Sequence, residues 1–332
     1  MTEQAMPFDR LTRRNALILG TAVAAAGTTL HSLALPAAAE TPKKLDPLRP
    51  TAYRFTLGDF QITTVSDGTA EMPEPEKIFG VNQTPETVKA FAAEHLLPTD
   101  KLVNGFTPVV VNTGADLVLF DTGNAPGARP TTGLLAQRLA AAGIDPASIT
   151  VVVLTHFHPD HIGGLMTDGK PTFPNARYVW NGAEYAFWSD PAQENGPRAG
   201  VVKLVQSNVT PLKDKATEIK DGSDVVSGIR AMAAPGHTPG HTAFHIESGG
   251  QRLFLGGDFS NHFVLSLEQP DWFVSFDADK EQAVATRKKI LAMLASERIP
   301  FTSYHMPFPA LGFVEASGGS YRFVPVTYQL AP

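Results

Sequence analysis

The chain has 332 residues, of which 43% are hydrophobic and 18% are charged, and its net charge is −6. This acidic balance provides no basic surface for nucleic acid, and the absence of cysteine excludes disulfides, thiolate zinc sites, a cysteine nucleophile and cysteine lipidation. Any metal must therefore be held by His, Asp or Glu, which suit zinc, manganese, iron and cobalt.

The beginning of the chain, residues 1–39, is predicted to be a twin-arginine export signal. Arg10, Arg13 and Arg14 precede an uncharged, alanine-rich run that ends in small residues. The pattern predicts cleavage after Ala39 and a periplasmic or secreted protein. The alternative is a membrane-anchor helix, but the run is rich in Ala, Gly and Thr, so we expect no stable anchor.

The part of the chain that follows is predicted to be an extended lead-in over residues 40–52 and a single domain over residues 53–332. Alternating apolar and polar residues over 53–68 predict short strands that are separated by Gly-Asp and Asp-Gly turns. A proline-rich loop is expected over 70–86, and helical spacing predicts a helix over 87–97.

The middle of the chain combines strands and helices. Residues 107–123 predict a hairpin of two apolar strands, and residues 131–143 predict an amphipathic helix that stops at Gly143. The apolar run over 149–154 predicts a buried strand, and residues 175–190 predict a strand followed by an aromatic-rich segment.

The last third of the chain continues this mixture. Residues 229–259 predict three strands, and residues 277–299 predict a helix that Asp277 or Asp279 could cap. A short strand is expected to end at His305. Because strands and helices are mixed in both halves, we expect one α/β domain of packed layers.

The most informative motif is "THFHPDH", which follows the buried strand directly. It places His156, His158, Asp160 and His161 within six residues. Four donors from one loop exceed what a single tetrahedral site would take, so the spacing predicts two adjacent metal sites.

Three further donors also follow predicted strands: His237, Asp258 and His305. A carboxylate at the rim of a buried strand is costly unless it is paired or bound to metal. Asp258 is therefore predicted to be a ligand that bridges two cations.

The motifs "THFHPDH", "PGHTPGH" and "LGGD", together with the late His305, resemble the metallo-β-lactamase superfamily in order and spacing. The resemblance implies an α/β fold, the four-layer αβ/βα sandwich, with metals at one edge. It implies two divalent ions, zinc first and Mn²⁺, Co²⁺ or Fe²⁺ as alternatives. The implied ligands are His156, His158 and His237 for the first ion, Asp160, His161 and His305 for the second, and Asp258 for both.

The expected reaction is hydrolysis by a hydroxide that bridges the metals. Asp160 and Asp258 are the predicted catalytic residues, with Asp160 orienting the nucleophile or passing a proton. Asp121 and His241 are predicted to support the metal ligands through hydrogen bonds.

Finer stretches, "LGDFQITTVSDGT", "VNTGADLVLFDTG" and "GSYRFVPVTY", resemble the methyl parathion hydrolase group of organophosphorus hydrolases. This resemblance implies a phosphotriesterase with esterase or lactonase side activity, a small-molecule ester substrate and a homodimer. It implies a substrate pocket that contains Phe187, Trp188 and Phe276, and His262 is a further candidate for that pocket.

Two alternatives stay open. The first is a lactonase that acts on acyl-homoserine or other lactones, and the second is a metal-binding protein without catalysis. Lactonases of this superfamily tend to carry a tyrosine just after the bridging aspartate, where this chain continues "FSNHF". A lactone leaves as a poor alkoxide that needs a proton donor, and His262 could take that part.

Overall fold

The computed structural model describes residues 49–128 and 130–328. The export signal predicted for residues 1–39 and most of the predicted lead-in lie outside these described residues. Within the described ranges, no helix is both long enough and apolar enough to cross a membrane. The described residues belong to one compact unit.

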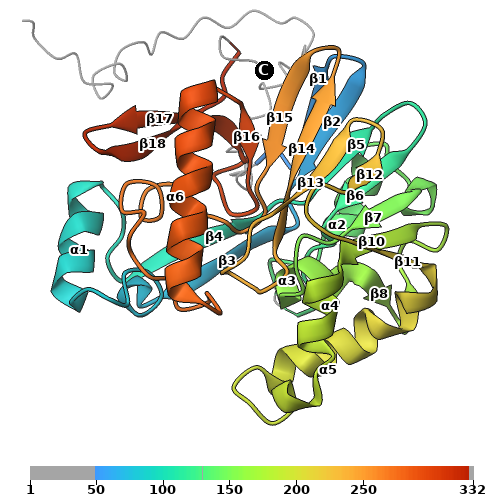
Figure 1. Cartoon of the computed structure of the whole chain (residues 1–332), viewed down its shortest axis with the longest axis horizontal. Helices are drawn as coiled ribbons and strands as arrows, with labels where there is room; N and C mark the ends of the chain where they lie inside the picture. Colours follow the sequence, from blue (N-terminus) through green and yellow to red (C-terminus); the bar gives the residue numbers. More distant parts are fainter. Residues whose placement is uncertain (1–48, 129, 329–332) are drawn as a thin grey trace, which may run out of the picture. The chain divides into compact units, whose positions relative to one another are not determined.

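The first large sheet has seven strands in the order β1-β2-β5-β6-β7-β10-β11 (Figure 1). They are β1 (Ala52–Leu57), β2 (Phe60–Val65), β5 (Val109–Asn112), β6 (Leu117–Phe120), β7 (Val151–Val153), β10 (Arg177–Asn181) and β11 (Ala216–Ile219). In this sheet, β1, β2, β5 and β6 pair antiparallel with one another, whereas β6, β7, β10 and β11 run parallel. The predicted hairpin over 107–123 is confirmed as β5 and β6.

The second large sheet also has seven strands, in the order β12-β13-β14-β15-β16-β17-β18. They are β12 (Asp224–Val226), β13 (Ile229–Ala233), β14 (Thr242–Ser248), β15 (Gln251–Leu255), β16 (Phe301–Thr302), β17 (Leu311–Ser317) and β18 (Ser320–Pro325). Only β15 and β16 run parallel among its neighbouring strands. The three strands predicted over 229–259 are confirmed as β13, β14 and β15.

The described α-helices are α1 (Pro85–Glu94), α2 (Leu135–Ala141), α3 (Pro159–Ile162), α4 (Gly182–Trp188), α5 (Ala199–Asn208) and α6 (Lys280–Glu297). Among them, α2 and α5 pack on the outer face of the first sheet and α6 on that of the second. Leu139 of α2 and Val205 of α5 pack with Val152 of the first sheet. On the far side, Leu294 of α6 packs with Phe254 of the second sheet.

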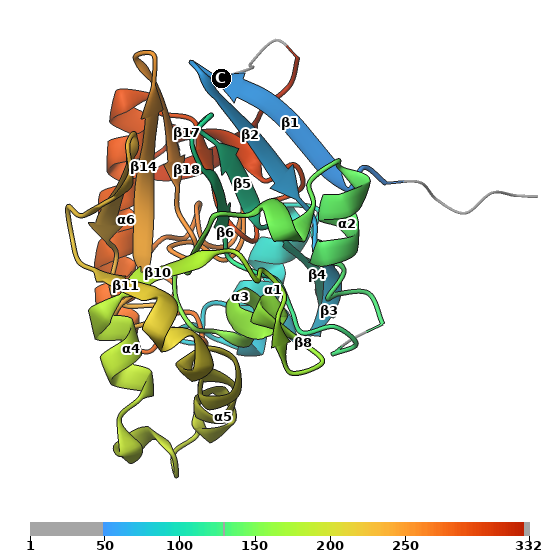
Figure 2. The same ribbon diagram turned by 90° about the vertical axis from the view of Figure 1, so that its right-hand side faces the viewer.

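The third core lies between the sheets, where Val111 and Val118 of the first pack with Phe244 and Ile246 of the second. Figure 2 shows the resulting layers, with α6 outside β14 and α2 outside β1 and β2. This arrangement confirms the predicted four-layer αβ/βα sandwich. Valine-rich strands suit it because both faces of each sheet are covered.

Two small hairpins complete the fold: β3 (Gly68–Pro73) with β4 (Lys101–Phe106), and β8 (Met166–Thr167) with β9 (Lys170–Pro171). The prediction of a loop over 70–86 is wrong at both ends, since residues 70–73 belong to β3 and residues 85–86 to α1.

Other predicted boundaries also differ from the structure, two of them beside the predicted metal ligands. The strand expected to end at His305 stops at Thr302, so His305 lies in the following turn. The helix expected over 277–299 begins at Lys280, and Asp279 caps it by accepting a hydrogen bond from the Gln282 amide. Asp277, the other candidate cap, is buried.

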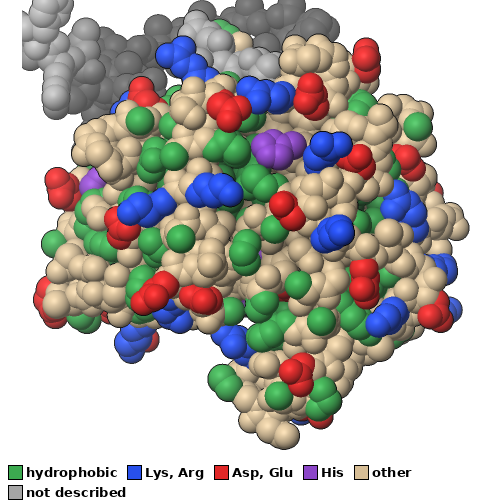
Figure 3. All heavy atoms as spheres, in the orientation of Figure 1, with side chains coloured by type: hydrophobic (Ala, Val, Ile, Leu, Met, Phe, Trp, Pro, Cys, Tyr) green, Lys and Arg blue, Asp and Glu red, His purple; other side chains and the backbone are tan. Residues whose placement is uncertain are grey.

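The molecular face in Figure 3 carries Lys, Arg, Asp and Glu side chains that are interspersed over the surface. Neither sign gathers into a continuous patch on this face. The view therefore offers no single-sign surface of the kind that steers a highly charged partner.

Candidate metal centre

The predicted donors meet because four strands end at the same edge of the sandwich. The loop after β7 carries the "THFHPDH" residues, and the loops after β13, β15 and β16 carry the other three donors. β6 and β7 are parallel neighbours, as are β15 and β16. Carboxyl ends of parallel strands lie at one edge, so donors that are distant in sequence become neighbours.

The loop after β7 lies close to the loop after β6, and two glycines that follow the motif leave room for this contact. A Cβ atom on Gly164 would lie 2.0 Å from the Thr122 carbonyl oxygen, and one on Gly163 would lie 2.3 Å from the Ala125 amide nitrogen. Thr122 in turn donates its amide and hydroxyl hydrogens to the His161 carbonyl, each at 2.8 Å. The glycines therefore let this loop pack against the loop after β6.

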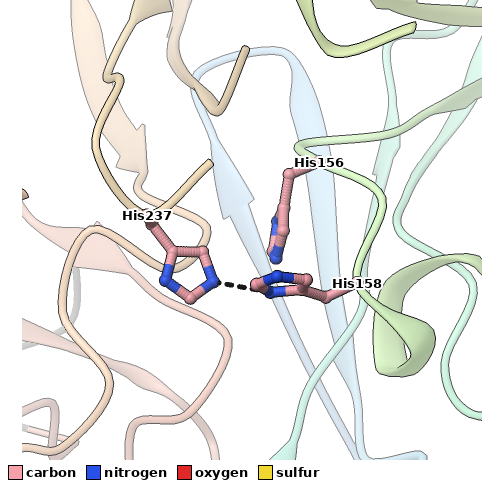
Figure 4. Close-up of side chains that lie close together, drawn as sticks. All are labelled: His156, His158 and His237. Carbon is pink, nitrogen blue, oxygen red and sulfur yellow. Dashed lines mark hydrogen bonds between the residues drawn. The ribbon is translucent and has the colours of Figure 1, made fainter. Parts of the chain in front are cut away.

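His156, His158 and His237, the three-histidine set, form one cluster of possible metal ligands. Figure 4 shows His156 and His158 on one loop and His237 on another, with their rings converging. His158 Nδ1 lies 2.9 Å from His237 Nε2. The structure thus brings together the first predicted set of ligands.

Asp160, His161 and His305, the mixed set, form a second cluster. Asp160 Oδ2 lies 3.4 Å from His161 Nε2 and 3.5 Å from His305 Nε2. His161 is fully buried, whereas the Asp160 side chain is 21% exposed and is the most open donor of its set. The structure thus brings together the second predicted set as well.

The carboxylate of Asp258 lies between the two sets. Its Oδ2 is 3.4 Å from His237 Nε2 and 3.0 Å from His305 Nε2. Its Oδ1 is 3.4 Å from His161 Nε2. Asp258 is therefore within reach of a cation in either set, as the sequence predicts.

Three buried atoms around Asp258 test whether a cation fits here. His156 Nε2, His161 Nε2 and Asp258 Oδ1 have no hydrogen-bond partner among residues 49–128 and 130–328. Buried polar atoms are rarely left without a partner. Two imidazole lone pairs and a carboxylate oxygen within 4.8 Å of one another suit a divalent cation.

Hydrogen bonds on the outer side of the rings fix their tautomers. His161 Nδ1 donates to Asp121 Oδ2 at 2.9 Å, and Asp121 also accepts from the Thr155 amide and hydroxyl. Asp121 has a φ of 60°, a left-handed conformation that turns its carboxylate back to these donors. His156 Nδ1 donates to the Thr155 hydroxyl oxygen at 3.1 Å. Both rings therefore present Nε2 to the centre, and Asp121 takes the supporting place predicted for it.

His237 is oriented by residues that sequence analysis did not assign to the site. Its Nδ1 donates to Asp277 Oδ1 at 2.9 Å, and Asp277 Oδ2 accepts from the buried Arg287 at 3.2 Å. Arg287 also donates to the carbonyls of Pro270 and Trp272. The sequence offered one signal for Asp277, namely a second aspartate beside a helix that needs only one cap.

His241 supports the central carboxylate. Its Nδ1 donates to the Ala234 carbonyl at 3.0 Å, so its Nε2 can accept the Asp258 amide hydrogen at 2.9 Å. His241 therefore holds the Asp258 backbone and is not part of either cluster of possible ligands. This is the supporting place predicted for it.

Burial and neighbouring charges shift the pKa values of the histidines and of Asp258 in different directions. Burial lowers the pKa values of His156 and His158 well below the ordinary value, and neighbouring imidazoles lower them further. Burial also opposes the charge of His161, but the nearby carboxylates, led by Asp258, outweigh it and raise its pKa well above the ordinary value. Burial would raise the pKa of Asp258, but His305 and His161 hold it well below the ordinary value. An ionised carboxylate surrounded by imidazoles matches a site for a cation.

The residues predicted for a substrate pocket are scattered. A cavity of about 1000 Å³ opens beside His305 and is lined by His262 but not by the other three. Trp188 is 1% exposed and buries its ring beneath His158. Phe187 packs against the core of the first sheet, and Phe276 is 46% exposed. The structure therefore places Phe187, Trp188 and Phe276 outside this cavity, and the substrate pocket expected from them stays a prediction.

A tyrosine near the metal centre, Tyr304, uses its hydroxyl hydrogen in a bond within the protein. The hydroxyl of Tyr304 donates to the Asp160 carbonyl at 2.6 Å, and its ring lies 3.9 Å from that of His161. Burial raises the pKa of Tyr304 well above the ordinary value. Tyr304 therefore supports the loop and has no free hydrogen for a substrate.

Comparisons with known proteins agree with this geometry. A family model described as the metallo-beta-lactamase superfamily matches residues 107–302. The solved structure of AidC, a dizinc quorum-quenching lactonase in complex with the product N-hexanoyl-L-homoserine, superposes with a TM-score of 0.78. It is 28% identical, and the match covers 83% of this chain and 98% of AidC.

Curated relatives match over shorter lengths. The N-acyl homoserine lactonase AttM of Azorhizobium caulinodans is 31% identical over 124 residues, which are 36% of this chain and 44% of AttM. An atrochrysone carboxyl ACP thioesterase of Claviceps purpurea is 23% identical over 210 residues, 63% of this chain and 55% of the relative. The chain thus spans about half the length of the curated relatives it matches.

Proposed function

The chain belongs to the metallo-β-lactamase superfamily and is a metal-dependent hydrolase; we propose that it hydrolyses lactones of the N-acyl homoserine type with two zinc ions. The observation that carries this proposal is the similarity to the dizinc lactonase AidC over 98% of that protein's length. The supporting observation within the chain is the pair of donor sets that share Asp258.

We assign the three-histidine set to one ion, the mixed set to the other, and Asp258 to both. Two divalent ions held there would polarise the substrate carbonyl and lower the pKa of water enough for attack at neutral pH. No serine or cysteine nucleophile is then required. The chain's own part is to hold seven donors in place and to manage the protons.

Asp160 is the donor best placed to handle a proton from the attacking water. Its side chain is 21% exposed, more than those of His161 and His305 beside it. Burial opposes ionisation, but His161 and His305 outweigh it and lower the pKa of Asp160 to about 2. Asp160 is therefore ionised at neutral pH, and its carboxylate can orient that water by accepting a hydrogen bond from it.

His262 can assist the leaving alkoxide. Its Nδ1 accepts hydrogen bonds from the amides of Val264 and Leu265, both at 3.1 Å, so the ring hydrogen is on Nε2. Burial lowers the pKa of His262 to about 3, which keeps the ring neutral. Because the ring lines the cavity beside His305, we assign its Nε2–H as the hydrogen-bond donor to the leaving oxygen.

A lactone fits these features better than the aryl phosphotriester expected from the sequence. The aromatic residues expected to hold an aryl leaving group, Phe187, Trp188 and Phe276, do not line the cavity. An aryl phosphotriester releases a stabilised phenolate that needs little help, whereas a lactone releases an alkoxide that needs a donor. His262 provides such a donor.

The test is a side-by-side measurement of kcat/KM on an N-acyl homoserine lactone and an aryl phosphotriester, with the zinc-loaded protein. We expect a preference for the lactone of at least about 100-fold, the size of effect that a positioned proton donor gives. A preference for the phosphotriester would overturn the substrate assignment and leave the metal centre standing. Bound zinc without turnover of either substrate would favour a metal-binding protein without catalysis.

A further inference from the structure

A buried carboxylate outside both donor sets lies behind the three-histidine set. Glu184 is in α4 and is 1% exposed. Its Oε1 accepts hydrogen bonds from the Phe157 amide at 2.9 Å and the Trp188 indole at 2.7 Å. Its Oε2 accepts from the Thr238 hydroxyl at 2.7 Å and the Gly240 amide at 2.9 Å.

These donors belong to the two loops that carry the three-histidine set. Phe157 lies between His156 and His158, so Oε1 holds the backbone at the centre of that pair. Thr238 and Gly240 follow His237, so Oε2 holds the other loop. One carboxylate group thus joins two loops that are about eighty residues apart, and its two oxygens fix the distance between them.

The glycine in the second loop is an independent sign that this contact is tight. A Cβ atom on Gly240 would lie 2.2 Å from the amide nitrogen of Glu184 and 2.5 Å from its Cα atom. Any other residue at position 240 would therefore push α4 away from the loop. The close approach of the two backbones makes the hydrogen bond to Glu184 possible.

Helix α4, which carries Glu184, is held in position by hydrogen bonds at its first turn. Asn181 caps the helix by accepting from the Ala183 amide at 2.9 Å. The same side chain donates to the Thr242 hydroxyl oxygen at 3.1 Å, which ties the start of α4 to strand β14 of the second sheet. The carboxylate therefore projects from a helix whose position the rest of the fold sets.

We propose that Glu184 is a positioning residue that sets the separation of the two histidine loops and thereby the metal affinity of the three-histidine set. This inference rests on the proposed function, since it concerns the same metal centre. All four partners of Glu184 are donors, so only an ionised carboxylate can accept from all of them. An amide of the same shape would face the Gly240 amide with a donor and lose that bond.

The test is Glu184→Gln, with zinc affinity measured by competition against a chromogenic chelator and cobalt binding followed by its absorption spectrum. We expect the zinc affinity of one of the two sites to fall about 10- to 100-fold, the usual effect of removing a residue that orients metal ligands. The second site is expected to keep its affinity, because the mixed set makes no contact with Glu184.

Asp67→Asn is the matched control, because Asp67 is equally buried and also accepts four hydrogen bonds. They come from Asn124, which donates through both its amide and its side chain, and from the amides of Gly133 and Leu135. None of these partners is on a histidine loop of the three-histidine set. The control should lose thermal stability as Glu184→Gln does and keep the zinc affinity of the affected site.

The outcomes separate the two proposals. Unchanged zinc affinity in Glu184→Gln, or an equal loss in Asp67→Asn, would overturn the positioning role while the metal centre stands. A wild-type chain that binds no zinc would overturn both the metal centre and the role of Glu184. A selective loss in Glu184→Gln alone supports the positioning role.

Discussion

The rim that holds the seven donors and the cavity beside it are built in opposite ways. The rim consists of the strand-end loops that carry the seven candidate ligands, of which five are buried and two, His158 and Asp160, are partly exposed. Each imidazole except that of His158 is held by a hydrogen bond from its outer nitrogen. The cavity is lined by segments that are distant in the sequence, among them Val103, Leu134, Phe263 and Phe308. The chemistry is therefore fixed by short motifs, whereas the substrate preference depends on how remote segments pack.

From this comparison we expect the largest losses of bound zinc and turnover when Asp258, at the centre of the rim, is replaced. Asp258→Ala would remove a carboxylate that lies within reach of both donor sets. We expect bound zinc to fall and turnover to drop by at least about 1,000-fold, as when a central member of a catalytic unit is removed. Metal analysis and lactone hydrolysis measure this, with circular dichroism as the check on folding. Turnover close to that of the wild type would contradict the assignment of Asp258.

The next effect comes from the supporting layer of the rim. Asp277→Asn would weaken the hydrogen bond that orients His237, and we expect zinc affinity to fall about 10- to 100-fold. The neighbouring Asp279→Ala is the control, since that residue is exposed and only caps α6. It should lower the free energy of unfolding by about 1 kcal/mol and leave zinc affinity unchanged. Equal zinc affinity in both variants would mean that Asp277 has no part in the centre.

His262 lies at the boundary between rim and cavity, and its substitution sharpens the comparison. His262→Phe would remove the Nε2–H donor and keep a ring that packs with Phe79 and Phe263. We expect kcat on an alkyl lactone to fall about 100-fold, while kcat on an aryl ester with a good leaving group changes little. An equal loss on both substrates would assign His262 a purely structural role.

The smallest effect is expected from the cavity wall. Phe263→Ala would widen the cavity without touching a donor of either set. We expect the ratio of kcat/KM for long and short acyl chains to shift by about 10-fold, because pocket contacts with methylene groups discriminate by amounts of that order. Zinc affinity should stay constant. A change in zinc content with an unchanged chain-length ratio would contradict the division into rim and cavity.

The same division explains how far sequence analysis could reach. The four layers and the grouping of seven candidate ligands could be predicted, because apolar runs followed by metal-ligating side chains are local patterns. Asp277 could not be separated from Asp279 as a cap, since both precede the same helix and only packing buries one of them.

The residues behind and beside the donors were less accessible for a different reason. Glu184 lies in an aromatic-rich segment with no motif, and its role depends on loops that precede and follow it in the chain. The same helix packs Trp188 into the core, a placement that its aromatic sequence does not reveal. The positions of Glu184 and Trp188 both depend on tertiary contacts, which the local sequence does not show.

The most direct test of the account is lactone turnover measured against bound zinc per chain, starting from protein stripped with a chelator. We predict no turnover in the stripped chain and full turnover when both donor sets, joined by Asp258, are filled with two equivalents of zinc. Undiminished turnover in the stripped chain, or turnover that does not change as zinc is added, would contradict the metal centre on which the proposed function rests.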